Sequence, residues 1–293
     1  MEIIRDIKAM QQFAASLPSE GRRLGLVPTM GSLHQGHLSL IRLLEGRCDL
    51  KAASIFVNPI QFGRGEDFER YPRNEARDFA LLSGAGCELV FCPQPEDMYP
   101  QGFQTHIEVE ALSQPLCGVF RPGHFRGVAT VVLKLFTITN CAVAAFGLKD
   151  YQQAMVIKQM VSDLNLSVDL VFGETLREPD GLAMSSRNAY LSQEERRIAV
   201  AVPRSLEWAR RELDGGECNP ESLKQGMGKI LTSSGQVRVQ YVEVADPDTL
   251  LPLERIAGRA LLVLAVYVGK SRLIDNTVAG PGSGAKPIAG VSV

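Results

Sequence analysis

The sequence predicts an α/β protein, in which a parallel sheet forms a first domain and a smaller α+β domain follows. Over the first 175 residues, short continuous apolar runs alternate with segments of helical periodicity, which is typical of a parallel sheet covered by helices on both faces. From residue 176 the pattern changes to a polar loop, long helical stretches and two apolar runs with β character. We therefore expect one domain over residues 1–175, a second over 176–278, and a flexible Gly/Pro/Ser-rich tail at 279–293.

The elements of the first domain are expected in order along the chain. Residues 1–20 have the apolar spacing of an amphipathic helix that ends at Pro18, and residues 24–27 form a strand that ends at Pro28. Further strands are expected over 50–57, 87–92, 105–110, 142–146 and 168–172, and helices over 34–44, 74–84, 128–136 and 151–164. In the second domain we expect helices over 193–213 and 221–231 and strands over 237–244 and 260–268.

The composition excludes several classes of protein. With 31 Lys and Arg against 33 Asp and Glu, the net charge of −2 argues against a surface that grips nucleic acid. No apolar run reaches membrane-spanning length, and we expect no signal peptide. The six cysteines form no C-x-x-C pair and no zinc-ligand spacing with histidine, so we expect reduced thiols in a cytoplasmic protein.

Residues 25–41, GLVPTMGSLHQGHLSLI, join the end of an apolar run to a turn and the start of a helical pattern. His34 and His37, two of the four histidines in the chain, lie three residues apart and therefore on one helix face. Gly36 removes a side chain between them, which lets a ligand approach the backbone. A helix N-terminus binds phosphate readily, and imidazoles add donors that can become cationic. We expect a phosphate site here; the simpler alternative is two surface histidines at a helix start.

Polar residues also follow two other predicted strands. Asn58 and Gln61 follow one strand, where an ordinary Asn-Pro turn is the simpler interpretation. Lys149 and Asp150 stand at a strand-to-helix junction, and Gln153 follows on the first helical turn. In parallel sheets ligands bind at the carboxyl ends of strands, so we expect these segments to meet the histidine pair in one site.

Two loops add cationic and hydroxyl groups. In RPGHFRGV, residues 121–128, His124 follows a sharp bend and stands beside two arginines, so it is either an anion-binding group or a loop histidine with local partners. In AMSSRN, residues 183–188, the hydroxyls of Ser185 and Ser186 and the guanidinium of Arg187 can wrap a triphosphate.

The H-x-G-H tetrapeptide resembles the signature of the nucleotidyltransferase superfamily, which transfers AMP or another nucleotidyl group and releases pyrophosphate. Six segments in order resemble the pantoate–β-alanine ligase family: PTMGSLHQGH, FVNPIQF, YPR, RPGHFRGV, KDYQQ and GLAMSSRN. The resemblance covers residues 24–192 and continues more weakly through the second domain. It implies a Rossmann-like first domain, a second domain that acts as a lid, a homodimer, and Mg²⁺ with ATP as cosubstrate.

The resemblance also implies residue roles. His34, His37, Lys149 and Arg187 would be the catalytic residues, which neutralise the triphosphate. The nucleotide would contact Met30, His34, His37, Gly147, Lys149, Asp150, Met184, Ser185, Ser186 and Arg187, and pantoate would contact Asn58, Gln61, His124 and Gln153. Two positions depart from the family pattern, because Leu148 replaces a polar or charged residue and Arg77 replaces an acidic residue before Asp78. No protein ligand of Mg²⁺ is therefore predicted, and ATP and water would hold the ion.

The reaction implied is the ATP-dependent condensation of pantoate with β-alanine to pantothenate, through a pantoyl adenylate, with release of AMP and pyrophosphate. Three alternatives remain at this point. One is a nucleotidyltransferase that moves AMP onto a phosphate monoester. Another is a tRNA-binding module descended from a synthetase, against which the slightly acidic charge argues. The third is a nucleotide sensor without catalysis.

Overall fold

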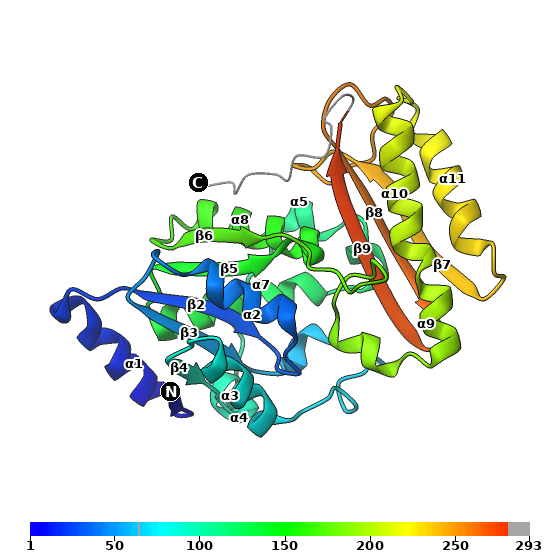
Figure 1. Ribbon diagram of the computed structural model, residues 1–293. Coiled ribbons are helices and arrows are strands. Elements are labelled where there is room, and N and C mark those ends of the chain that lie inside the picture. Colours follow the sequence, from blue (N-terminus) through cyan, green and yellow to red (C-terminus); the bar gives the residue numbers. More distant parts are fainter. Residues whose placement is uncertain (64, 281–293) are drawn as a thin grey trace.

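The computed structural model of the protein describes residues 1–63 and 65–280, which form two sheets (Figure 1). The first is a six-stranded sheet in the order β1-β4-β3-β2-β5-β6, and every neighbouring pair is parallel. The second is a three-stranded antiparallel sheet in the order β7-β8-β9. The predicted fold class, a parallel α/β unit followed by a smaller α+β unit, is confirmed.

The parallel unit contains the first six strands and eight helices. Its strands are β1 (Glu2–Ile4), β2 (Leu24–Thr29), β3 (Leu50–Ile55), β4 (Leu89–Phe91), β5 (Val143–Gly147) and β6 (Asp169–Gly173). Its helices are α1 (Ile7–Ser16), α2 (Gln35–Leu43), α3 (Glu75–Gly84), α4 (Pro95–Met98), α5 (Glu110–Ser113), α6 (Cys117–Phe120), α7 (His124–Thr139) and α8 (Tyr151–Asp163), with 3-10 turns η1 (Leu17–Glu20), η2 (Pro59–Gln61) and η3 (Leu148–Asp150).

The second unit contains α9 (Gln193–Ala199), α10 (Ala201–Asp214), α11 (Pro220–Thr232), β7 (Val237–Ala245), β8 (Ala260–Val268) and β9 (Ser271–Ala279), preceded by η4 (Ser186–Tyr190). Figure 1 shows α10 and α11 along one face of this sheet. The central strand, β8, has the sequence ALLVLAVYV and is buried almost throughout. Each leucine buried there contributes roughly 1.5–3 kcal/mol of transfer free energy to folding.

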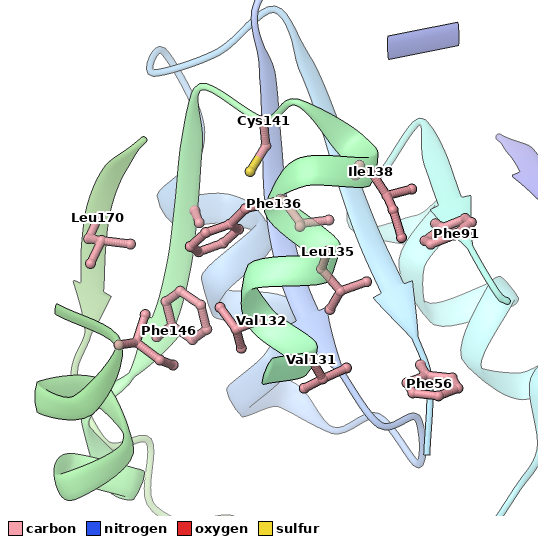
Figure 2. Packing of buried hydrophobic residues seen from close by; sticks show 14 of the residues in the cluster. Phe56, Phe91, Val131, Val132, Leu135, Phe136, Ile138, Cys141, Phe146 and Leu170 are labelled. Carbon is pink, nitrogen blue, oxygen red and sulfur yellow. The ribbon is translucent and has the colours of Figure 1, made fainter. Parts of the chain in front are cut away.

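Helices cover the parallel sheet on both faces. The larger core contains apolar side chains of α1, α7 and α8, and a second core on the opposite face contains those of α2 and α3. In Figure 2, α7 lies over the sheet, with Phe136 beside Phe146 of β5. The two rings are 6.3 Å apart at 71°, an edge-to-face arrangement that aromatic quadrupoles favour. Burial on both faces explains why these strands read as continuous apolar runs.

The chain changes the side of β2 on which it adds strands. From β2 the chain goes to β3 on one side, and β5 pairs with β2 on the other side. Loops that leave the carboxyl ends of β2 and β5 therefore diverge and open a crevice, where open parallel sheets bind ligands. Met30 follows β2 and Lys149 follows β5, as the sequence predicted.

Residues 105–110 are not a strand, contrary to the prediction. The segment is extended up to Val109 and α5 begins at Glu110. The backbone N–H of Ile107 donates to Thr130 Oγ1 of α7 (3.0 Å), and Val109 is buried in the larger core. Its alternating pattern thus reflects packing against a helix on one side and solvent on the other, which sequence alone cannot distinguish from a half-buried strand.

Two predicted helices are each divided. Residues 1–20 contain β1, which pairs with β4, before the Asp6 carboxylate accepts from Ala9 N–H (2.8 Å) and starts α1. Residues 193–213 contain α9 and α10, which meet at Val200. Pro203 lies in the first turn of α10 and has no N–H to donate to the preceding turn, so the predicted long helix is interrupted at Val200, one turn earlier.

Strand β9 was not predicted, and the tail was predicted to start too early. Ala279 is the last residue of β9, whereas the rest of the predicted tail lies outside the described residues except for Gly280. Arg272, Asp275 and Asn276 interrupt the apolar pattern of this strand. These polar side chains have partners elsewhere in the chain, which the sequence does not reveal.

Candidate active site

The two histidines of the H-x-G-H tetrapeptide form the cap of α2. His34 is the N-cap residue, and its Nδ1 accepts from the backbone N–H of Gly36 (3.1 Å). His37 Nδ1 accepts in turn from the backbone N–H of His34 (3.3 Å). A Cβ on Gly36 would lie 2.9 Å from the His34 ring, so the glycine makes room for the imidazole itself. The rings lie 4.1 Å apart at 41°.

These bonds determine the protonation of both rings. A nitrogen that accepts a hydrogen bond carries no proton, so each neutral ring has its proton on Nε2. Burial lowers the pKa of His34 to about 4, with a further decrease from Lys149, and burial lowers the pKa of His37 to about 3, with a further decrease from His34. At neutral pH the free protein therefore presents two neutral Nε2–H donors. Protonation would also break both caps.

Asp78 fixes the turn that leads to this cap. Its side chain is buried, and its two carboxylate oxygens accept from the backbone N–H groups of Ser32 and Leu33, each at 2.8 Å. Gly31 and Ser32 both have positive φ, 81° and 52°. For serine this conformation is unfavourable, and the two hydrogen bonds from Asp78 stabilise it. Sequence reasoning noticed Asp78 only as a neighbour of Arg77.

The carboxyl end of β5 carries Lys149, Asp150 and Gln153. The Lys149 ammonium lies 3.7 Å from the Asp150 carboxylate, and its side chain is 20% exposed. Gln152 is buried and bonded to the backbone of Cys117, Leu112 and Pro115. Its neighbour Gln153 also lines the cavity, and the side chain of Gln153 makes no hydrogen bond within the described residues. Both glutamines line the cavity, but the Gln152 amide is bonded within the protein, whereas the Gln153 amide is available to a ligand.

Asn58 and Gln61 lie side by side at the end of β3. Asn58 Nδ2 donates to Gln61 Oε1 (2.9 Å) and to the carbonyl of Gly127 (3.1 Å), and Asn58 Oδ1 accepts from the hydroxyl of Tyr99 (2.7 Å). Gln61 Nε2 is 3.2 Å from the sulfur of Met30. The Asn58 amide is therefore fully used within the protein and orients Gln61.

His124 is buried in a chain of hydrogen bonds. Glu66 forms a bidentate ion pair with Arg121, whose Nη1 lies 3.0 Å from His124 Nε2. His124 Nδ1 lies 2.8 Å from the carbonyl of Gln61. Arginine can only donate, so Nε2 accepts and Nδ1–H donates to Gln61. Burial lowers the pKa of His124 to about 4, and the Arg121 charge lowers it further.

The loop of Ser185, Ser186 and Arg187 packs against residues that follow η2. The Arg187 guanidinium binds both carboxylate oxygens of Asp67, at 3.0 and 2.9 Å, and lies 5.9 Å from the centre of the Tyr71 ring. The hydroxyl of Ser186 lies 3.3 Å from that of Tyr71. Arg187, predicted as a phosphate ligand, is therefore paired with a carboxylate in this structure.

A cavity of about 700 Å³ lies between the two sheets, and its lining includes only some of these groups. His34 and His37 are not among the lining residues, although His34 is close enough to the lining residue Lys149 for burial and this charge together to lower its pKa. Of the sequence-predicted residues, its lining includes His124, Lys149, Asp150, Gln153, Ser185 and Arg187. Gln61, Asn58, Met30 and Ser186 adjoin this wall through the contacts given above. Met184 contacts the start of α2, because a Cβ on Gly36 would lie 3.8 Å from Met184 Cβ. Gly147 is the last residue of β5, and Leu148 and Lys149 follow it.

Sequence reasoning missed the contribution of the second sheet to this cavity. Tyr241 of β7 and Tyr267 of β8 line it, as do Lys270 and Arg272 around the start of β9. Tyr241 and Tyr267 stand in apolar runs that predict strands only, and Lys270 and Arg272 follow the last predicted strand, so no sequence signal marked them. Asp67 and Glu66, the partners of two arginines, were also missed.

Known proteins are similar to this chain over nearly its full length. A sequence model described as pantoate-beta-alanine ligase matches residues 2–278. The pantothenate synthetase of Moorella thermoacetica is 51% identical over 278 residues, which cover 95% of this chain and 98% of the relative. The chain belongs to the pantoate–β-alanine ligase family. It is an enzyme of the kind that forms pantothenate by joining pantoate to β-alanine.

Solved structures of pantoate–β-alanine ligases have the same fold. The pantothenate synthetase from Thermus thermophilus is 42% identical, with a TM-score of 0.90, and the match covers 96% of this chain and 100% of that structure. The ligase from Francisella tularensis, solved with beta-gamma ATP and beta-alanine, is 36% identical with a TM-score of 0.79, over 95% of this chain and 97% of that one. Membership over both sheets excludes the three alternatives weighed from the sequence.

Proposed function

We propose that this ligase works through a pantoyl adenylate, formed in the cavity between the two sheets. In the first step a carboxylate oxygen of pantoate bonds to the α-phosphorus of ATP, and the bond from that phosphorus to the pyrophosphate oxygen breaks. In the second step the β-alanine amine bonds to the acyl carbon, the bond to AMP breaks, and the amine loses a proton. The supporting observation is that Lys149, Ser185 and Arg187 line one cavity together with Gln153, and that His34, beyond the end of β2, lies within the electrostatic influence of Lys149.

The part of the site that would bind ATP consists of hydrogen-bond donors, which can stabilise the phosphates without giving up a proton. His34 and His37 would offer Nε2–H groups, and Lys149 a full positive charge. These groups are held before ATP arrives, so little reorganisation is needed as negative charge moves to the leaving pyrophosphate. Arg187 would exchange its Asp67 partner for a phosphate oxygen, with Ser185 and Ser186 on the same loop.

The substrate side consists of amides that match hydroxyl and carboxylate groups. Gln153 lines the cavity, and the backbone carbonyl of Gln61 accepts from the lining residue His124. Asn58 would act by orienting Gln61, because its own amide is bonded to Gln61, Gly127 and Tyr99. His124 would act in the same way, since both ring nitrogens have protein partners.

We propose that Mg²⁺ enters with ATP rather than in a cage of protein ligands. Five acidic side chains line the cavity, and three of them are bonded to arginines: Glu66 to Arg121, Asp67 to Arg187, and Asp275 to Arg177. Of the other two, Asp150 lies 3.7 Å from the Lys149 ammonium and Glu195 accepts from the backbone N–H of Ser192. The described residues contain no cluster of three or more His, Cys, Asp and Glu side chains that could hold a metal ion. This donor set fits an ion held by phosphate oxygens and water. When bound, the ion would neutralise charge on the phosphates.

The domain boundary, the lid and the oligomer remain proposals that the family resemblance supports. We propose a catalytic domain over residues 1–175, a lid domain over 176–278 that closes on ATP, and a homodimer. All six cysteines are free thiols, which supports a cytoplasmic location. No helix among residues 1–63 and 65–280 is long and apolar enough to cross a membrane. Light scattering on the purified protein tests the dimer.

Product analysis in two stages tests the adenylate. With Mg²⁺-ATP and pantoate but no β-alanine, the enzyme should release pyrophosphate in an amount comparable to its active sites and retain pantoyl adenylate. Added β-alanine should then convert the adenylate to AMP and pantothenate. ADP and phosphate as products would instead require an acyl phosphate and would overturn the proposed mechanism.

A further inference from the structure

Strand β9 forms one edge of the second sheet and contacts the loop that carries Lys149. Asn276 on this strand is 7% exposed. Its Nδ2 donates to two consecutive backbone carbonyls of the parallel unit, that of Leu148 (3.0 Å) and that of Lys149 (2.8 Å). One amide group thus uses both of its hydrogens on the residue that follows β5 and on the lysine itself.

The preceding residue, Asp275, holds the second phosphate-type loop. Its side chain is fully buried and accepts two hydrogen bonds from Arg177, from Nη1 at 2.7 Å and from Nη2 at 3.0 Å. It also accepts from the backbone N–H of Asn276 (2.8 Å), which fixes the two side chains relative to each other. Planar, bidentate pairing of this kind defines geometry as well as energy.

Arg177 connects Asp275 to the loop that carries Ser185, Ser186 and Arg187. It forms a bridge with Ala183 across a tight turn, and its Nη1 donates to the carbonyl of Gly181 in that turn (3.0 Å). After the turn, the chain continues from Ala183 through Met184 to Ser185. The position of this loop therefore depends on where Arg177 is held.

We propose that Asp275 and Asn276 are a pair of positioning residues that hold the Lys149 loop and the Ser185–Arg187 loop at a fixed separation. This inference rests on the proposed function of those loops in binding the triphosphate. Both residues line the cavity, but their side-chain polar atoms are used on Arg177 and on the Leu148 and Lys149 carbonyls, so they would act through Lys149 and Arg177. Two loops from different parts of the chain must close on the same phosphates, and a shared anchor on β9 aligns both.

The amide is chemically required at position 276. Aspartate has the same shape but no hydrogen to donate at neutral pH, so it would direct an anion at two carbonyl oxygens. Alanine would remove the donor without adding charge. Packing between the two units would remain in either variant, because an apolar cluster that includes Leu148, Tyr151 and Leu261 lies beside the pair.

Half-reaction kinetics test this role. In Asn276→Asp and Asn276→Ala, pantoate-dependent release of pyrophosphate should slow about 10- to 100-fold, because small displacements of reacting groups have effects of that size. The aminolysis of supplied pantoyl adenylate by β-alanine should change by less than about twofold, because the β- and γ-phosphates have already left. The matched control is Thr277→Val on the same strand. The Thr277 side chain points to the face opposite to that of Asn276 and makes no hydrogen bond within the described residues.

The outcomes separate this inference from the proposed function. If wild-type enzyme releases no pyrophosphate with pantoate, the adenylate mechanism is wrong and the role of the pair fails with it. If wild-type enzyme does so and both Asn276 variants keep its rate, only the positioning role is overturned. Equal losses in the two half-reactions would also overturn it, because general damage to the fold affects both.

Discussion

At the scale of single residues, the backbone partners of a side chain decide what it can do. The type of residue predicted which amides and imidazoles matter here, but hydrogen bonds divide them into groups that can meet a ligand and groups that orient others. His34 and His37 use Nδ1 on backbone N–H groups and keep Nε2–H for a ligand. His124 uses both nitrogens within the protein. The sequence assigned all three to the site but could not predict this difference.

The adjacent glutamines of α8 provide a matched test. Gln153→Ala should raise the KM for pantoate much more than that for ATP and leave the free energy of unfolding unchanged. Gln152→Ala should destabilise the protein, because each buried backbone group left without a partner costs about 1–3 kcal/mol. Urea unfolding and steady-state kinetics measure both effects. An unchanged pantoate KM in Gln153→Ala would refute its assignment to the substrate.

The buried histidines should make stability depend on pH. The pKa of His124 falls from 6.5 to about 4 on folding, so the unfolded chain binds more protons between these values. The free energy of unfolding should therefore decrease as pH falls from about 6.5 towards 4, with a contribution from His124 of up to about 3 kcal/mol. His34 and His37 act in the same direction. Urea titrations at pH 7.5, 5.5 and 4.5 test this, and stability that stays constant over this range would contradict it.

At the scale of elements, the sequence predicted those strands that are buried on both faces. Strands β2, β3 and β5 are buried on both faces and read as apolar runs, so they and the motifs at their ends were found. The polar side chains of β9 have partners about 100 to 130 residues away in sequence, Arg177 and the Leu148–Lys149 backbone, and such pairings leave no local pattern. Asp78 was missed for the same reason, because the two N–H groups that it binds are 45 and 46 residues away.

Gly127 of α7 permits the close contact between α7 and η2. A Cβ there would lie 2.6 Å from the carbonyl oxygen of Ile60 and 2.7 Å from Cα of Gln61. Gly127→Ala should therefore displace η2, weaken the bond from Asn58, and raise the KM for pantoate at least tenfold, an effect of about 1.4 kcal/mol. Gly84→Ala, at an open position at the end of α3, is the matched control and should leave kinetics unchanged. A pantoate KM equal in the two variants would refute this coupling.

At the scale of the whole molecule, the site depends on an apolar contact between the two units. Leu148, where the resemblance led us to expect a polar or charged residue, packs in a cluster that contains Tyr151 of the parallel unit and Leu261 and Val263 of β8. An apolar side chain at position 148 therefore fits its surroundings, because it joins the two units beside Lys149. The cavity lies along this contact, so its shape depends on how the units meet as well as on each fold.

Two neighbouring leucines of β8 test that dependence, because successive side chains of a strand point to opposite faces. Leu261 is 1% exposed and lines the cavity in the cluster shared by both units, whereas Leu262 is fully buried in the core of the second unit. Replacing either with alanine should destabilise the protein by about 2–5 kcal/mol, measured by urea unfolding. Only Leu261→Ala should also lower kcat/KM for ATP, because it removes contact between the units. If both variants retained wild-type kinetics, or lost activity equally, the contact between the units would not control the site.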